Sequence, residues 1–82
     1  MNDQPVTELD VIGLHCPLPV LKARQIMRRL KTGDQLLIAA TDPLAVIDIP
    51  HFCREDGHTL VSTSESNGVH RFTVVKGKDN QT

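Results

Sequence analysis

The stretch VTELDVIGLHCPLPVLKARQIMRRLKTGDQLLIAAT, residues 6–41, decides the fold. Residues 6–12 have the composition of a strand, and residues 17–32 predict a helix that stops at Gly33, a favourable residue after a helix end. Residues 35–41 form an apolar run of strand length, which predicts a central strand buried on both faces. A strand, a helix and a strand in this order predict a parallel unit with a right-handed crossover.

Two helix-start signals follow within residues 42–56. Asp42 and Pro43 form a cap followed by a proline at the first helical position. The DIP sequence of residues 48–50 repeats this signal inside the segment. The pattern therefore predicts a short helical turn followed by a separate second helix over residues 49–56.

The remaining chain predicts an antiparallel hairpin. Residues 58–65 alternate in polarity, the SNG of residues 66–68 is a turn signal, and residues 69–76 have strand composition. The complete order is β-α-β-α-β-β, an α/β (α+β) two-layer sandwich with two helices on one face of a mixed four-stranded sheet. We expect one domain over residues 1–82, with an ordered core at about residues 6–76.

Composition narrows the function classes. Nine Lys and Arg balance ten Asp and Glu, and the net charge of −1 argues against general nucleic-acid or membrane binding. Phe52 and Phe72 are the only aromatic residues, so a base-stacking platform is nearly excluded. Two cysteines fit a reducing compartment, and residues 1–10 lack a basic and apolar leader pattern. A soluble, cytoplasmic protein is expected.

Cys16 falls at the expected N-cap of the first helix, where partial positive charge favours a thiolate by about 0.3–1 kcal/mol. Pro17 and Pro19 have no N–H, so they withhold two of the donors at this helix end and hold the thiol outward. The N–H of Leu18 is the main donor left. A thiol that must accept and surrender a group is served best by a pKa near ambient pH, which we expect for Cys16.

Other uses of the two cysteines are less well supported. An N-cap flanked by prolines is a poor site for a buried, purely structural Cys16, whereas Cys53 beside Phe52 is expected in the core. No CxxC or zinc-like spacing exists, so we expect no metal and no cofactor. The side chains with metal-ligand chemistry are His15, Cys16, His51, Cys53, His58 and His70. No base and oxyanion hole for nucleophilic hydrolysis are evident either.

Helical spacing separates the first helix into an apolar and a polar face. The apolar face consists of Val20, Ala23, Ile26, Met27 and Leu30. The polar face consists of Lys22, Arg24, Gln25, Arg28 and Arg29. Leu18 and Leu21 fall on the polar side near Cys16, either as ordinary exposed residues or as a small docking patch for a partner.

Several motifs resemble the TusA (SirA-like) sulfur-carrier family. The CPxP signature of that family matches residues 16–19, and the preceding LDVIGL matches the strand that approaches the cysteine. TDP (41–43), DIPHFC (48–53) and GH (57–58) also match, and the similarity extends from about residue 8 to 77. The resemblance implies a fold like that of the C-terminal domain of bacterial translation initiation factor three.

The resemblance also implies a function. Cys16 would receive a sulfane sulfur as a persulfide from a cysteine desulfurase and pass it to an acceptor protein, most directly for 2-thiouridine formation in tRNA. Molybdenum-cofactor maturation and sulfur oxidation are the alternatives within the family. The resemblance implies a carrier with a persulfide intermediate rather than an independent enzyme with a substrate pocket, with no direct contact to nucleic acid or membrane, and we expect a monomer.

The resemblance places further residues near the partner-facing surface: Pro17, Leu18, Pro19, Leu21, Arg24, Asp42 and Phe52. Leu18 departs from the family, where an acidic residue is frequent, and this departure would alter partner choice. Two rival hypotheses remain. One is a thiol redox protein that uses Cys16 and Cys53, and the other is a regulatory interaction module without sulfur chemistry.

Overall fold

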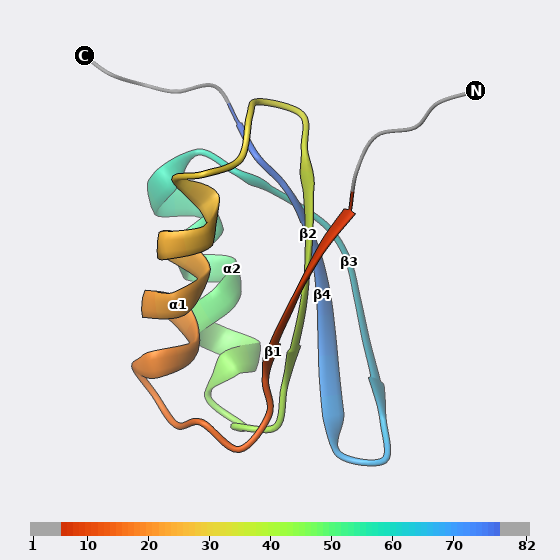
Figure 1. Ribbon diagram of the computed structural model, residues 1–82. Coiled ribbons are helices and arrows are strands. Elements are labelled where there is room, and N and C mark those ends of the chain that lie inside the picture. The colour runs from red at the N-terminus through yellow and green to blue at the C-terminus, as the bar shows by residue number, and fades with distance from the viewer. Residues whose placement is uncertain (1–5, 78–82) are drawn as a thin grey trace.

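The computed structural model describes residues 6–77 and confirms the predicted order of elements (Figure 1). The elements are β1 (Val6–Val11), α1 (Leu18–Met27), β2 (Gln35–Ala40), α2 (Ala45–Asp56), β3 (Thr59–Ser66) and β4 (Val69–Val75). Within residues 6–77, no helix is long and apolar enough to cross a membrane. The ends of the predicted domain, residues 1–5 and 78–82, lie outside the described residues.

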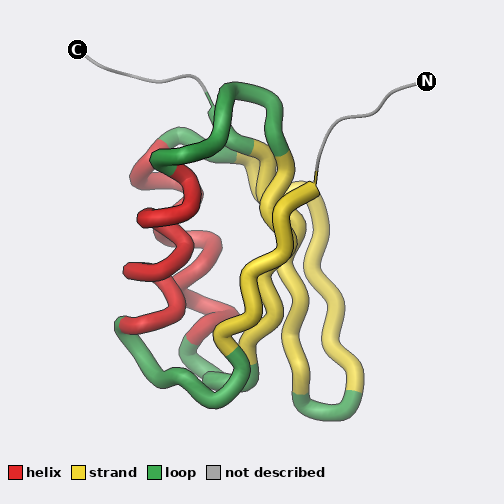
Figure 2. Tube along the Cα trace, viewed as in Figure 1, coloured by secondary structure: helices red, strands yellow, loops and turns green. Residues whose placement is uncertain are grey.

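The two helices lie side by side on one face of the sheet, and the opposite face carries no helix among the described residues (Figure 2). The strand order is β1-β2-β4-β3. β1 pairs with β2 in parallel, whereas β4 runs antiparallel to both of its neighbours. The predicted mixed sheet in a two-layer α+β sandwich is therefore confirmed.

The core lies between the helices and the covered face of the sheet. Leu36, Ile38 and Ala40 of β2 are buried, but Leu37 and Ala39, which point to the other face, are only half-buried. The prediction of a strand buried on both faces was wrong because helices cover one face only. The apolar face predicted for the first helix packs on the core as expected: Ala23 and Met27 are buried, and Val20, Ile26 and Leu30 are partly buried.

α1 ends at Met27, five residues before the predicted end of the helix. The N–H groups of Arg29 and Leu30 donate to the carbonyls three residues earlier, which tightens the chain into a turn. The Nζ of Lys76 then donates to the carbonyls of Met27 at 2.8 Å and Leu30 at 2.7 Å. A side chain from the far end of the chain thus fastens the end of α1 and the turn that follows it.

α2 is one continuous helix that contains Pro50, so the predicted division at residue 48 was wrong. Its first turn continues directly from the loop after β2, because the Asp42 carbonyl accepts a hydrogen bond from the Ala45 N–H at 2.9 Å. Pro50 removes one hydrogen bond from the helix interior. Burial of Ile49 and Phe52 on the core side compensates for that loss.

The β3–β4 hairpin is confirmed at the predicted turn. Asn67 and Gly68 have φ angles of 54° and 81°, and positive angles at both central positions define the turn that matches the twist of a hairpin. The register shifts between Leu60 and Ser62, so Val61 forms a bulge in β3. The bulge lies in an edge strand, near the end opposite to this turn.

Candidate functional site

Cys16 lies in the loop between β1 and α1, at the end of the molecule where both helices begin (Figure 1). Its side chain is an exposed free thiol. The N-cap of α1 is Pro17, one residue later than predicted, and the peptide bond between Cys16 and Pro17 is cis. Cys16 therefore precedes the helix rather than capping it.

Two hydrogen bonds fasten the cysteine loop to the loop between β2 and α2. The Cys16 N–H donates to Oδ2 of Asp42 at 2.7 Å, and the Gly13 N–H donates to Oγ1 of Thr41 at 2.9 Å. The other oxygen of Asp42 accepts from the Leu44 N–H at 3.2 Å. One buried carboxylate thus orients both the cysteine loop and the start of α2.

The carboxylates around Cys16 raise the pKa of its thiol. The main cause is a hydrogen bond to the Asp48 carboxylate, and the negative charges of Asp48 and Asp42 act in the same direction. The Leu18 N–H donates to the His15 carbonyl at 2.8 Å, so it is engaged within its own turn. The expectation of a pKa near ambient pH, set by the helix end, was therefore wrong.

A shallow cavity of about 200 Å³ lies between the helices beside the thiol. Its lining consists of Cys16, Pro17, Val20, Arg24, Asp48, His51, Phe52 and Glu55. The apolar side chains Val20 and Phe52 alternate with charged groups contributed by both helices. The thiol thus has one solvent-open side and one side that faces a mixed groove.

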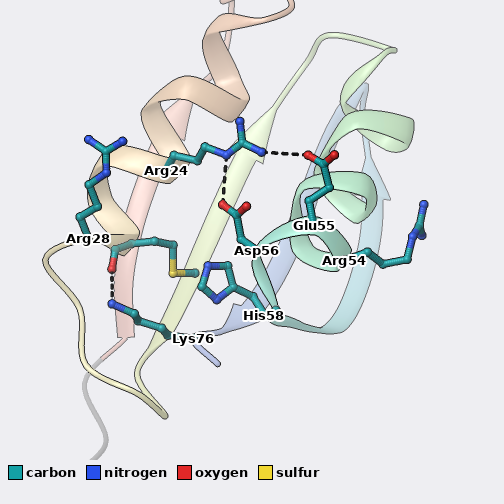
Figure 3. Close-up of a pocket in the computed structure, with 9 residues that line it drawn as sticks. Arg24, Arg28, Arg54, Glu55, Asp56, His58 and Lys76 are labelled. Atoms are coloured by element: carbon teal, nitrogen blue, oxygen red, sulfur yellow. Dashed lines mark hydrogen bonds and ion pairs between the residues drawn. The ribbon is translucent and has the colours of Figure 1, made fainter. Parts of the chain in front are cut away.

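A second hollow of about 560 Å³ continues between the helices toward Lys76 and His58 (Figure 3). Arg24 and Glu55 line both cavities. Arg24 donates to Oε1 of Glu55 at 3.2 Å and to Oδ2 of Asp56 at 3.0 Å, and its guanidinium lies 5.5 Å from the centre of the Phe52 ring. These contacts link α1 to α2 midway along the groove.

Not all of the predicted partner-facing residues are accessible. Pro17 is exposed, Leu18 and Leu21 are 43% and 48% exposed, and Arg24 is half-exposed. The side chains of three other predicted contact residues are buried: Pro19, Asp42 at 7% and Phe52 at 1% exposure. Pro19 lies in the first turn of α1, Asp42 anchors the cysteine loop, and the ring of Phe52 lies against the guanidinium of Arg24.

Of the residues of α2, sequence reasoning placed only Phe52 near this site and missed the acidic and exposed apolar residues of the helix. Asp48 and Glu55 line the cavity from α2, and Ile47 is 66% exposed near the start of the same helix. Leu44, the N-cap of α2, is also exposed. The available signal was an apolar and acidic helix start, which the predicted break before residue 49 obscured.

Cys53 is buried, as predicted, and burial raises the pKa of its thiol to about 11. Cys16 and Cys53 thus occupy different environments, the first open to solvent and the second inside the core. Within residues 6–77, no group of three or more His, Cys, Asp or Glu side chains is arranged to hold a metal ion. The site is defined by one accessible thiol on a two-layer α+β domain.

Comparison with known proteins identifies the family. The family model described as sulfurtransferase TusA matches residues 7–76. Two candidate sulfur carrier proteins of Neisseria meningitidis, one from a serogroup A strain and one from a serogroup B strain, are each 48% identical over 67 residues, which cover 82% of this chain and 88% of theirs. The chain belongs to the TusA sulfurtransferase family.

A solved structure supports the fold. The SirA-like protein of Desulfitobacterium hafniense superposes with a TM-score of 0.77, covering 90% of this chain and 100% of its own. The two sequences are 21% identical, so this similarity concerns the architecture alone. The architecture inferred from the sequence motifs is thereby confirmed.

Proposed function

We propose that this protein is a cytoplasmic sulfur carrier that accepts a sulfane sulfur from a cysteine desulfurase as a Cys16 persulfide and relays it to an acceptor protein. The observation that carries the proposal is the exposed Cys16 thiol on a loop fastened at its own backbone N–H. A thiol that must meet the sulfur of another protein has to protrude, and a fixed loop makes its position reproducible. Membership of the TusA family supports the same chemistry.

The proposed transfer is a thiol exchange without net oxidation. The Cys16 sulfur attacks the outer sulfur of the donor persulfide, a new S–S bond forms, and the S–S bond of the donor breaks. The donor leaves as a thiol, and Cys16 carries an S–S–H group. In the second step, an acceptor cysteine attacks the outer sulfur and Cys16 leaves as a thiol.

The surface around Cys16 supports docking of both partners in turn. Leu18 and Leu21 on α1, together with Leu44 and Ile47 at the start of α2, expose apolar side chains at the cysteine end of the molecule. Because the two sulfurs must touch during each transfer, the donor and acceptor footprints overlap around Cys16. A monomer presents this surface without obstruction.

We further propose that the sulfur serves 2-thiouridine formation in tRNA. This destination rests on the resemblance of the DIPHFC segment, residues 48–53, to TusA itself, and the alternatives are molybdenum-cofactor maturation and sulfur oxidation. The test is complementation in cells that lack their own carrier. Restoration of thiolated tRNA supports this destination, and restoration only of molybdoenzyme activity or of sulfur oxidation would replace it.

The carrier chemistry is tested by intact mass spectrometry after incubation with a cysteine desulfurase and cysteine. The wild-type protein and a Cys53→Ser variant should gain sulfur atoms that DTT removes, and Cys16→Ser should gain none. Loading of Cys16→Ser at the wild-type level would overturn the proposal. An intramolecular disulfide in the wild-type protein, in place of added sulfur, would favour the thiol redox hypothesis, and full activity of Cys16→Ser in cells would favour the regulatory module.

A further inference from the structure

Asp48 has an unusual position among the charged residues of the site. It lies in the first half of α2 and lines the small cavity together with Cys16, so its carboxylate lies beside the thiol. Its side chain is half-buried rather than enclosed. The proposed sulfur-carrier function gives this carboxylate no role.

The basic side chains of Arg24 and His51 near Asp48 are engaged elsewhere. Arg24 on α1 pairs with Glu55 and Asp56, and His51 on α2 lies 3.3 Å from Glu55. Within residues 6–77, no ion pair involves Asp48. The carboxylate that holds the thiol therefore lacks a countercharge from the described part of its own chain.

The charges that face the Cys16 sulfur come from every element around it. α1 contributes Arg24, the loop before α2 contributes Asp42, and α2 contributes Asp48, His51 and Glu55. His15 precedes the cysteine in its own loop. Arg24 is paired with Glu55, so the negative charges of Asp48 and Asp42 remain to disfavour a thiolate at this place.

This arrangement protects the thiol of the free carrier from oxidants but does not activate it for sulfur transfer. The thiolate is the nucleophile in exchange reactions and is also the form that oxidants attack. A thiol held by a carboxylate is therefore slow toward oxidants and toward sulfur donors alike. A carrier of this design needs a partner that changes the electrostatics of the site on docking.

We propose that the Asp48 carboxylate, beside Cys16 in the small cavity, keeps the resting Cys16 sulfur in its thiol form, and that a basic side chain of the sulfur donor releases it by pairing with this carboxylate. The inference rests on the proposed carrier function. Charge complementarity identifies the partner: a protein that places Lys or Arg beside its own persulfide. The half-buried Asp48 carboxylate is the contact point.

The sulfur transfer that follows release of the thiol is balanced in atoms and electrons. Once the donor cation has paired with Asp48, the Cys16 sulfur attacks the outer sulfur of the donor persulfide. The proton of the Cys16 thiol passes to the sulfur that leaves the donor. The products are a Cys16 persulfide and a donor thiol, with no oxidant or reductant consumed.

The experiment compares Asp48→Asn with the wild-type protein in two assays whose expected changes have opposite signs. The first assay measures the rate of alkylation by iodoacetamide against pH in the free protein. Removal of the charge should lower the pKa of the Cys16 thiol and speed its alkylation several-fold near neutral pH. The second assay measures persulfide loading by a cysteine desulfurase, which should slow several-fold because the donor cation loses its countercharge.

Ionic strength and a matched control complete the design. Loading of the wild-type protein should slow as salt rises, and this dependence should weaken in Asp48→Asn. Glu8→Gln removes an exposed carboxylate from β1, and it should leave both assays unchanged. Thermal melts should show that both variants are folded.

The outcomes separate the inference from the proposed function. An alkylation profile of folded Asp48→Asn that matches the wild type would show that Asp48 does not hold the thiol. Loading that stays constant or accelerates together with alkylation would show that the donor brings no cation to Asp48. Failure of the wild-type protein to accept any sulfur would instead overturn the carrier function, while the alkylation result would stand alone.

Discussion

The backbone N–H of Cys16 donates to Oδ2 of Asp42 across 2.7 Å, although 26 residues separate the two in the chain. Asp42 is almost completely buried, so the position of the most exposed functional atom depends on an interior carboxylate. The bond makes the cysteine loop part of the packed structure. A change at Asp42 should therefore affect both folding and sulfur loading.

Asp42→Ala tests this dependence. The substitution leaves the N–H groups of Cys16 and Leu44 without their acceptor, and a typical hydrogen bond contributes about 0.5–1.5 kcal/mol. We expect a clearly lower free energy of unfolding in denaturant titrations and slower sulfur loading. Asp10→Ala is the control, because Asp10 accepts only a local, exposed bond from the Ile12 N–H. Equal stability of Asp42→Ala and Asp10→Ala would show that the loop is held by other contacts.

Leu21→Asp tests the docking surface. Leu21 is exposed near Cys16, so aspartate there should leave the melting temperature nearly unchanged while slowing both loading and unloading. Val61→Asp is the matched control, because Val61 is 57% exposed in β3 and lies outside the site. Transfer rates with a donor and with an acceptor provide the measurement. Wild-type rates in both directions for folded Leu21→Asp would mean that Leu21 is an ordinary exposed leucine.

Lys76→Met tests whether the Lys76 side chain stabilises the C-terminal end of α1. Methionine retains much of the aliphatic length but cannot donate to the carbonyls of Met27 and Leu30. Hydrogen bonds from charged groups contribute about 1.5–3 kcal/mol, so the free energy of unfolding should fall by about 2 kcal/mol. Lys31→Met, at an exposed position, should change it by less than about 0.5 kcal/mol. Similar stabilities of the two variants in urea would contradict the proposed capping role.

His58 should make stability depend on pH. Burial lowers the pKa of this histidine, whose Nδ1 accepts the Gly77 N–H at 3.0 Å. Because the unfolded state binds the proton more tightly, the stabilisation is complete above the ordinary histidine pKa of about 6.5 and is lost as pH falls through the lower pKa of the folded state.

Denaturant titrations from about pH 7.5 to about pH 5 measure this effect. His58→Asn can keep an acceptor for the Gly77 N–H and should flatten the dependence over this range. His51→Gln, at an exposed histidine, should retain the wild-type slope. A wild-type slope in His58→Asn would assign the pH dependence to other groups.

The order of strands and helices could be predicted because each element carries a local signal. Asn67 and Gly68 fix the hairpin turn through their own backbone preferences. The end of α1 could not be predicted in this way, because it depends on Lys76, which lies 46 residues after Leu30. Pro50 misled the prediction for α2, since burial of its neighbours outweighs a local helix-breaking tendency.

Some features of the candidate site likewise follow from a local signal, and others depend on tertiary packing. Cys16, Leu18 and Leu21 share one short segment. The exposure of Cys16 was predicted from its place beside two prolines at the helix start, and that of the two leucines from helical spacing. The carboxylates that control the thiol come from two other segments, which reach Cys16 only through tertiary packing. The sign of the pKa shift could not be predicted from the helix start alone, because Asp48 lies 32 positions further along the chain.

The burial of Cys53 turns the protein into a reporter of its own unfolding. In the native state, a thiol reagent at mildly alkaline pH meets the accessible Cys16, whereas the unfolded chain offers two reactive sulfurs. Labelling of Cys53 therefore requires that α2 opens away from the sheet beneath it. The rate of this labelling, compared with that of an unfolded peptide, converts directly into the free energy of that opening, with no dye or engineered probe.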